Sequence, residues 1–367
     1  MVYNMPDPSF THTFPAVRGM QGGRPCYIAM CPLRIIPKLF VFDEEVVPPE
    51  LRAQRTLNKA RVPEIATYLT DNSNNYTLSS LTASIDSRIT FDPLSDTGLA
   101  QNMGTISIPM DAQILINDGQ HRRAAIEEAI KEEPELGHDN ISVLFFIDEG
   151  LARSQQMFAD LNKNAVRPNE SISTLYDLRD PISELARYVQ KNVRVFSRLT
   201  ELEKSTISNR SRKLFTLSSI RNASKAFLQK SVKDDVSMDE KKLVVKFWNE
   251  VATNMTDWQE VLSRNITCAE LREQSINAHG VMLQAMGSIG PDLIVKRKSS
   301  WEKSLKKLSK IDWSRLHNSD WEGRAMVLGR ISKSRENVLL TGNYIKQKLG
   351  LQLNAKEEEI ESKYLNG

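Results

Sequence analysis

The sequence is poor in cysteine and has no long apolar run. Its three cysteines, Cys26, Cys31 and Cys268, cannot all pair with one another, and their spacing matches no zinc-binding motif. No apolar stretch approaches the roughly 18–20 residues that a membrane-spanning helix needs. The first ten residues also lack the basic segment and apolar run of a signal peptide. These absences argue against a disulfide scaffold or a membrane protein and predict a reduced, cytoplasmic protein.

The sequence also lacks the motifs of several large enzyme classes. There is no G-x-x-x-x-G-K-[ST] phosphate loop, no G-x-S-x-G nucleophile turn and no H-E-x-x-H zinc helix. The five histidines are scattered along the chain, which argues against a histidine-rich metal site. Any nucleotide hydrolysis must therefore use a different phosphate-binding arrangement.

Charge is nearly balanced over the whole chain but unevenly distributed along it. The formal net charge is +3. Residues 187–230 hold eleven Lys or Arg against two acidic residues, and 296–335 hold twelve against four. Residues 127–149 hold eight acidic residues and one Lys. Each stretch is either a solvated face or a surface for a charged partner.

The most informative stretch is 112–130, AQILINDGQHRRAAIEEAI. Ile114 to Ile116 predict a strand, and Asn117 to Gly119 predict a tight turn. Apolar residues at helical spacing then predict a helix that begins near Gln120.

The start of this helix is unusually cationic. His121, Arg122 and Arg123 fall in its first turn, where free N–H groups already create positive potential. A bound phosphate would relieve the repulsion, with N–H groups near Gly119 and the arginine forks as donors. Asp118 could cap the helix or hold a metal beside that phosphate. The alternative is an ordinary surface turn with solvated arginines and an aspartate cap.

The run DGQHR at 118–122 resembles the signature of the DGQHR-domain family, and in particular of its DndB branch, which is associated with DNA sulfur modification. Flanking features extend the resemblance over most of the chain. The family is similar to proteins of the ParB/sulfiredoxin-like fold. The resemblance, together with the helical texture of the second half, predicts an α+β protein: a mixed-sheet DGQHR (ParB-like) domain over 1–178, then a mainly helical, basic domain over 179–367.

Local patterns predict the remaining elements. Four prolines and a Gly-Gly pair indicate an extended arm over 1–25 with little regular structure. Strands are expected over 26–33, 39–42, 76–89, 104–110 and 141–147, the last covered on both faces because it is apolar throughout. Helices are expected over 51–69, with Pro63 in a first turn, and over 151–161, 182–193, 214–228 and 243–262. The acidic tail at 357–361 is predicted to be solvated.

Residues 155–164 are a second candidate for chemistry. Asn162 and Asn164 fall where a helix would end, and a C-cap explains them without a ligand. The resemblance implies instead that Asn162 faces a nucleotide, as an asparagine of ParB-like domains does, with Asn164 and Arg167 beside it. It also implies a ligand-facing arginine, either Arg55 or Arg61.

Two basic clusters in the second half are candidate DNA contacts. One is Arg210, Arg212 and Lys213. The other has helical spacing, and a phosphate backbone would remove the repulsion among its members; these are Lys303, Lys306, Lys307 and Lys310. Tryptophans at 301, 313 and 321 interleave with the second cluster and could stack on bases. Their spacing suits a helical core as well, and we expect them in the core.

Two functions fit these features. The first is a component of the DNA phosphorothioate modification system that binds DNA and binds and hydrolyses ATP or another NTP. Arg122 and Arg123 would clamp phosphates, Asp118 would hold Mg²⁺, Gln120 would position water, and His121 would act as acid, base or phosphate donor.

The partners that the resemblance implies are DNA and other sulfur modification proteins, and self-association is open. The second function is a non-enzymatic, DNA-binding regulator of transcription of the modification genes. Nuclease chemistry is less favoured, because no paired carboxylates surround Asp118.

Overall fold

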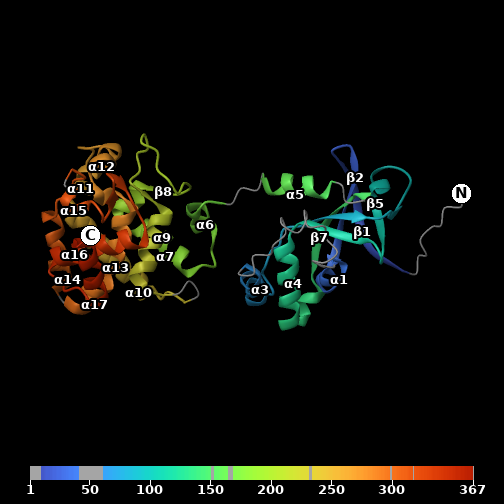
Figure 1. The fold of residues 1–367 in the computed structure, drawn as a ribbon, viewed down its shortest axis with the longest axis horizontal. Helices are drawn as coiled ribbons and strands as arrows, with labels where there is room; N and C mark the ends of the chain where they lie inside the picture. The colour runs from blue at the N-terminus through green and yellow to red at the C-terminus, as the bar shows by residue number, and fades with distance from the viewer. Residues whose placement is uncertain are drawn as a thin grey trace. The chain divides into compact units, whose positions relative to one another are not determined.

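The computed structural model describes residues 10–40, 61–149, 153–163, 168–230, 234–297, 300–316 and 318–366. Its contacts divide the chain into two compact units, residues 1–166 and 167–367, which we call the sheet unit and the helical unit (Figure 1). Within the described ranges, no helix combines the length and the apolar composition that a bilayer crossing requires. The structure is a mixed α/β protein, and each unit is described separately below.

A mixed sheet forms the core of the sheet unit. In the described part of the chain its seven strands lie in the order β4-β5-β1-β2-β7-β3-β6. β3 and β7 run parallel, and the other neighbouring strands run antiparallel. The strands are β1 (Thr11–Gln21), β2 (Arg24–Pro32), β3 (Leu81–Asp86), β4 (Thr90–Pro93), β5 (Met103–Pro109), β6 (Gln113–Asp118) and β7 (Asn140–Ile147).

The first two strands form a hairpin, so the extended arm expected over 1–25 is wrong for residues 11–21. Gln21 pairs with Arg24, which leaves Gly22 and Gly23 alone to make the turn. Their φ values are 59° and 72°, the left-handed pair that two-residue hairpins favour. Alternate side chains over residues 13–17 are buried, so packing holds β1 in the sheet despite Pro15.

The sheet carries short and long helices. α4 packs against α3 and α1, and α5 packs along β6. Residues 39–42 do not begin a strand: Leu39 ends a short helix with Pro37 in its first turn, and residues 41 and 42 lie outside the described part. The helical segments are η2 (Leu33–Ile35), α1 (Ile36–Leu39), α3 (Arg61–Asp71), η3 (Leu99–Asn102), α4 (Gln120–Glu132), η4 (Pro134–His138) and α5 (Ser154–Lys163).

The predicted strand–turn–helix at 114–130 is confirmed, with a shorter turn than expected. β6 extends through Asp118, and α4 begins at Gln120, so Gly119 alone joins them. Gly119 has φ 103°, and a Cβ on it would lie 2.4 Å from Leu81 Cδ2. Only glycine meets both conditions without strain.

The helical unit is built on a large aromatic core. All five tryptophans are buried, as expected for the three in the 296–335 stretch. Phe196 packs edge-on against Trp248, and Phe215 does the same against Trp258. The expected helix over 243–262 is divided at Met255.

The elements of the helical unit follow one another closely along the chain. α6 belongs to this unit because it packs on α7 and α9. The elements are α6 (Glu170–Tyr176), α7 (Pro181–Asn192), α8 (Arg194–Leu199), β8 (Thr200–Glu201), β9 (Phe215–Thr216), α9 (Leu217–Leu228), α10 (Met238–Asn254), α11 (Thr256–Leu262), α12 (Cys268–Gln274), η6 (Ile276–Ala278), α13 (Gly280–Arg297), α14 (Trp301–Leu305), η8 (Lys306–Lys310), α15 (Asn318–Trp321), β10 (Met326–Val327), β11 (Arg330–Ile331), α16 (Arg335–Leu349) and α17 (Ala355–Asn366).

The acidic tail is solvated only in part: Glu358 and Glu359 are exposed as expected, but Glu357 and Glu361 tie α17 to the core by charge. The side chains of Arg324 and Glu361 are each 7% exposed, and their closest N–O distance is 2.6 Å. Asn343 also donates to Glu361, and Lys346 pairs with Glu357 at 2.6 Å. A carboxylate in the core needs such partners, so the charges of the tail serve packing.

We predict that Gly119→Ala destabilises the sheet unit by about 2–4 kcal/mol, because the left-handed backbone and the crowding against Leu81 both oppose a Cβ. Native-state hydrogen exchange in β6 and α4 measures this, since the tryptophans all lie in the other unit. Gly23→Ala is the matched control: its φ is also positive, but nothing lies within 4 Å of the added Cβ. Its cost should be about 1–2 kcal/mol. Equal losses would contradict the packing argument.

Candidate functional site

The DGQHR residues form a corner at the edge of the sheet. Gly119 is the N-cap of α4 and has no side chain to cap it, and the first turn contains no acidic residue. The Arg123 N–H already donates to the Gly119 carbonyl, so the N–H groups of residues 120–122 are the ones at the helix start that lack an intrahelical acceptor.

A cavity of about 410 Å³ opens at this corner. It brings Arg61 of α3 together with four of the predicted residues, although they lie about sixty positions apart in the sequence. Its lining consists of Arg61, Ile65, Tyr68, Thr77, Leu78, Ser79, Asp118, Gly119, His121 and Arg122. Sequence reasoning missed Tyr68 and the segment 77–79 as site residues. It placed 77–79 inside a strand expected over 76–89, whereas β3 begins only at Leu81.

Arg122 is held by the protein itself. Its Nη1 donates to the carbonyls of Ser79 and Ser80, both at 2.9 Å, and to the Ser79 hydroxyl. Its Nη2 donates to Asp118 Oδ2 at 2.7 Å. The guanidinium therefore ties the end of β6 to the segment before β3. Its charge faces the cavity wall, but most of its donors are already used.

Arg61 supplies the second cation of the cavity. Within the described ranges no carboxylate forms an ion pair with it, whereas Arg122 is balanced by Asp118. The pKa of His121 is lowered, first by burial and then by the positive charges of Arg61 and Arg122. The cavity therefore has positive potential, and Asp118 is the one acidic group among its described lining residues.

Two predicted residues do not line this cavity. Arg123 points toward α1, where its Nη2 donates to the Pro37 carbonyl at 2.9 Å and its Nη1 pairs with Glu127 at 2.8 Å. Gln120 donates back to the Ile116 carbonyl at 3.4 Å. Arg123 therefore ties α4 to α1, and Gln120 ties the start of α4 to β6.

The remaining predicted ligand residues cannot be placed in the cavity. Asn162 lies in α5, which packs along β6, but its side chain is not among the described ones. Asn164, Arg167 and Arg55 lie outside the described residues. Their roles stay predictions.

A metal ion would find one carboxylate in the described lining, that of Asp118. The described residues contain no group of three His, Cys, Asp or Glu side chains that could hold a metal. This donor set does not make a preformed metal site. It does suit Mg²⁺ that arrives with a phosphate ligand, because Mg²⁺ commonly uses one or two carboxylates together with phosphate oxygens and water.

The three cysteines are free. Burial raises the pKa of Cys31 to about 12 and also raises the pKa of Cys268. These two thiols therefore stay protonated at neutral pH, and neither is the low-pKa thiolate that sulfur transfer uses.

The helical unit carries an arginine groove of about 720 Å³. It is lined by Arg198, Arg210, Arg212 and Arg264, all exposed, and its described lining has no carboxylate. Lys213 lies next to it and donates to the Arg198 carbonyl. Arg198 and Arg264 were missed because only the fold brings them to the 210–213 cluster.

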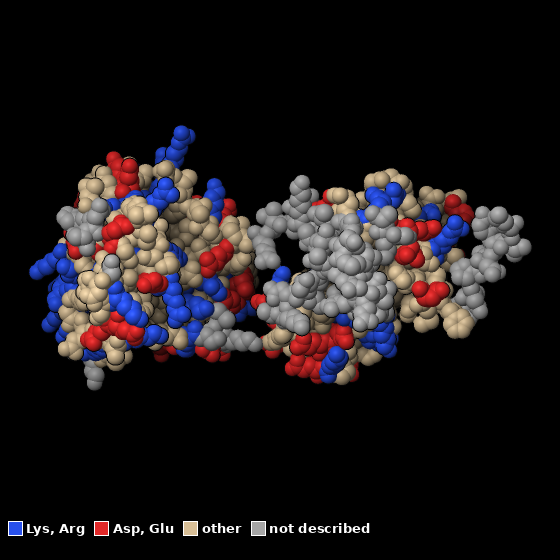
Figure 2. Space-filling view, viewed as in Figure 1, with Lys and Arg blue, Asp and Glu red and all other residues tan. Residues whose placement is uncertain are grey.

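The predicted lysine row is wrong as a single helical face. α14 ends at Leu305 and the tighter η8 follows, so the four lysines do not share one α-helical surface. Lys307 donates to the Leu349 carbonyl at 3.2 Å, at the C-terminal end of α16, where a cation suits the helix dipole. Lysines and arginines are spread over the visible face of the helical unit, and acidic side chains gather at the lower end of the sheet unit, by α4 and η4 (Figure 2).

Comparison with known proteins defines the class to which this fold and corner belong. A family model described as DNA-sulfur modification-associated matches residues 14–352, nearly the entire chain. The chain therefore belongs to the DndB family, and the family resemblance that the DGQHR run indicated is confirmed. Membership implies involvement in DNA sulfur modification. No curated protein and no solved structure matches the chain.

We predict that Arg61→Gln raises the pKa of His121 toward its usual value near 6.5, because one of the charges that oppose protonation is removed. An NMR titration of the His121 ring measures this. Arg18→Gln is the matched control: Arg18 bonds to Asn102, away from the DGQHR cavity.

The lowered pKa also has a consequence for stability. The unfolded state takes up the His121 proton more readily, so stability falls as the pH drops below about 6.5. Arg61→Gln should reduce that loss. An unchanged pKa in Arg61→Gln would contradict the electrostatic description of the cavity.

Proposed function

We propose that the protein binds the phosphates of ATP, or of another nucleoside triphosphate, in the DGQHR cavity and hydrolyses the nucleotide with Mg²⁺ as part of DNA sulfur modification. One observation carries the proposal: Arg61, His121 and the uncapped start of α4 line the same cavity. An anion in that cavity would balance the Arg61 charge and accept hydrogen bonds from the helix N–H groups.

The cavity residues have two roles: some hold the cavity together and others contact the ligand. Arg122 holds the cavity together, because the Ser79 and Ser80 carbonyls and Asp118 already use its donors. Arg61 is the phosphate clamp, a role that the sequence analysis gave to Arg122 and Arg123. His121 is placed to donate to a phosphate oxygen or to exchange a proton with water. Phosphoryl transfer depends chiefly on positioning and charge stabilisation, which this set supplies in kind.

Mg²⁺, when bound, would neutralise charge on the phosphates and orient them. Asp118 is the residue of the described lining that could hold it. One of its oxygens accepts from Arg122, and its side chain is 46% exposed, so its other oxygen remains available to an ion.

DNA binding at the arginine groove is the second part of the proposal. Four exposed guanidiniums with no carboxylate among them favour a polyanion, and arginine forks match phosphate geometry. Other proteins of the modification system are the implied partners. The ParB/sulfiredoxin-like relationship of the sheet unit is also proposed, and the mixed sheet with its strand–glycine–helix corner supports it.

We predict that Arg61→Gln weakens ATP binding at least tenfold and that Asp118→Asn removes Mg²⁺-dependent turnover while the protein stays folded. Steady-state turnover and equilibrium binding, with and without DNA, test this, and Arg18→Gln should behave as wild type. Bound nucleotide should also raise the pKa of His121, since the phosphates offset the Arg61 charge. Unchanged binding in Arg61→Gln would overturn the site. DNA binding with no turnover would favour the regulator function instead.

We predict that the double variant Arg210→Glu/Arg212→Glu weakens DNA binding at least tenfold. It should also lower the slope of log affinity against log salt by about two, because two phosphate contacts are lost. The control Lys242→Glu/Lys356→Glu makes the same change in net charge on exposed side chains that lie outside the groove and outside both predicted DNA-contact clusters. Equal weakening by both variants would show that net charge, not the groove, governs binding.

A further inference from the structure

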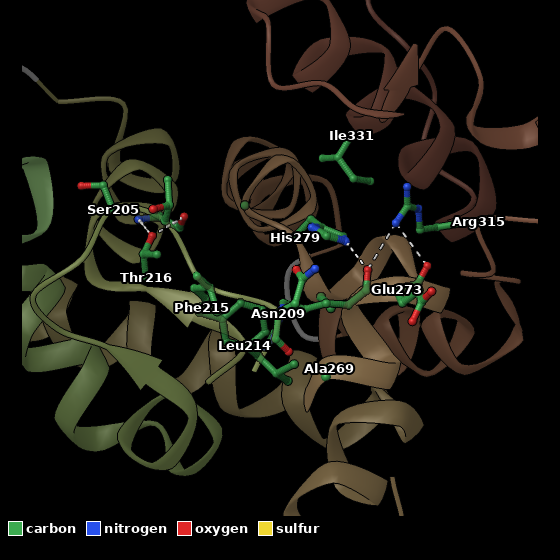
Figure 3. Close-up of a pocket in the computed structure, with 16 residues that line it drawn as sticks. Ser205, Asn209, Leu214, Phe215, Thr216, Ala269, Glu273, His279, Arg315 and Ile331 are labelled. Atoms are coloured by element: carbon green, nitrogen blue, oxygen red, sulfur yellow. Dashed lines mark hydrogen bonds between the residues drawn. The ribbon is translucent and has the colours of Figure 1, made fainter. Parts of the chain in front are cut away.

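The helical unit contains a second cavity, of about 630 Å³, which the proposed function does not use. It lies beside the loop that follows β8, the start of α9, and the turn between α12 and α13 (Figure 3). Its volume falls within the range of about 300–1,000 Å³ that is usual for small-molecule sites. The cavity and the arginine groove share Ala269, and both are lined by residues of the loop between β8 and β9.

Among the described residues, two arginines in its wall have backbone carbonyl groups as their hydrogen-bond partners. Arg272 donates to the backbone carbonyls of four residues, Ser208, Asn209, Ser211 and Lys213. Arg315 donates to the Glu273 carbonyl at 3.1 Å and to the Arg272 carbonyl at 3.5 Å (Figure 3). It also donates to the Gly329 carbonyl at 3.0 Å.

Neither guanidinium forms an ion pair with a carboxylate in the described part of the chain, and Glu273 is the one acidic residue in the described lining. Burial also lowers the pKa of Arg272. Two partly buried cations against one exposed carboxylate favour an anionic occupant.

The rest of the lining suits an apolar body attached to that anion. Ile207 and Ile331 are partly exposed apolar side chains, and with the buried Leu214, Phe215 and Ala278 they make an apolar floor. Thr206 and Asn209 provide polar groups nearer the rim. This mixture of an apolar floor with a few polar groups is typical of sites that bind small molecules with a ring and a charged end.

His279 adds a hydrogen-bond acceptor to the wall. Its Nε2 lies 2.8 Å from the Arg272 carbonyl and must carry the proton to donate to it (Figure 3). Burial lowers the pKa of His279 to about 4, so the ring is neutral and Nδ1 is left as an acceptor. A ring N–H of a ligand could use such an acceptor.

We propose that this cavity binds a phosphate-bearing small molecule of mononucleotide size. The charges of Arg272 and Arg315 would attract the phosphate. Arg315 would make the direct contact, because at least two carbonyl groups already occupy each terminal nitrogen of Arg272. The apolar floor would face the base. The site lies in the helical unit and uses none of the DGQHR residues, so it is independent of the triphosphate site proposed above.

Isothermal titration of the full chain with the four ribonucleoside monophosphates tests the proposal. At least one should bind at one molecule per chain. Asn209→Asp places a carboxylate in the wall without changing the size of the side chain and should weaken that binding at least tenfold. Asn192→Asp makes the same change at an exposed residue outside the cavity and should have no effect. Inorganic phosphate alone should bind more weakly, because it leaves the apolar floor uncovered.

Each alternative result has a definite meaning. Absence of binding by all four nucleotides, or equal binding by wild type and Asn209→Asp, would overturn the proposal. So would phosphate binding as tight as nucleotide binding. Loss of monophosphate binding in Arg61→Gln alone would show that the nucleotide sits in the DGQHR cavity. Loss in Asn209→Asp alone supports the new site whether or not the DGQHR cavity binds triphosphates.

Discussion

The sheet unit depends at its working edge on the hydrogen bonds of one guanidinium. Arg122 binds Asp118 at the end of β6 and the carbonyls of Ser79 and Ser80 before β3. β3 and β6 are neighbours in the sheet, with a register shift where they approach Asp118. The arginine therefore fixes where β6 ends, where β3 begins and where α4 starts, and Gly119 accepts the backbone angle that results. Replacing the arginine would remove its bonds to the Ser79 and Ser80 carbonyls and to Asp118 together, which is costlier than the loss of one contact.

This role of Arg122 changes how the family signature is understood. A cationic helix start suggests a phosphate clamp, but two of its three cations, Arg122 and Arg123, are engaged by the protein. Among the described residues, no carboxylate pairs with Arg61, the other cavity arginine, which lies on a different helix. The signature residues then shape the cavity, and a residue outside the signature adds the charge that no described carboxylate balances. Arg61 and Arg122 together create the positive potential at His121.

The sequence was most informative where a local pattern and tertiary packing agree. The strand and helix around Gly119, the apolar strands β2, β5 and β7 and the burial of the tryptophans all follow from periodicity. The β1 strand did not, because its prolines and glycines indicate irregular structure unless the partner strands are known. The lysine row failed for a related reason: helical spacing predicts a shared face only if one helix persists, and the helix tightens after Leu305.

Candidate sites were harder to predict than elements, because they join distant parts of the chain. Arg61 was one of two alternatives, and nothing local separates it from Arg55. Arg198 and Arg264 join Arg210 and Arg212 only through the packing of α8, α11 and the loop between β8 and β9. The sequence also does not show which groups a cation contacts in the fold. The hydrogen bond from Arg123 to the Pro37 carbonyl therefore could not be predicted.

The charges of the helical unit are of two kinds, the buried pair of Arg324 and Glu361 and the exposed arginines. Mobile ions screen exposed charges strongly and reach buried pairs poorly. A rise in ionic strength should therefore weaken attraction at the exposed arginines while α17 keeps its anchor. Salt titrations should therefore change association at the exposed arginines more than they change the attachment of α17.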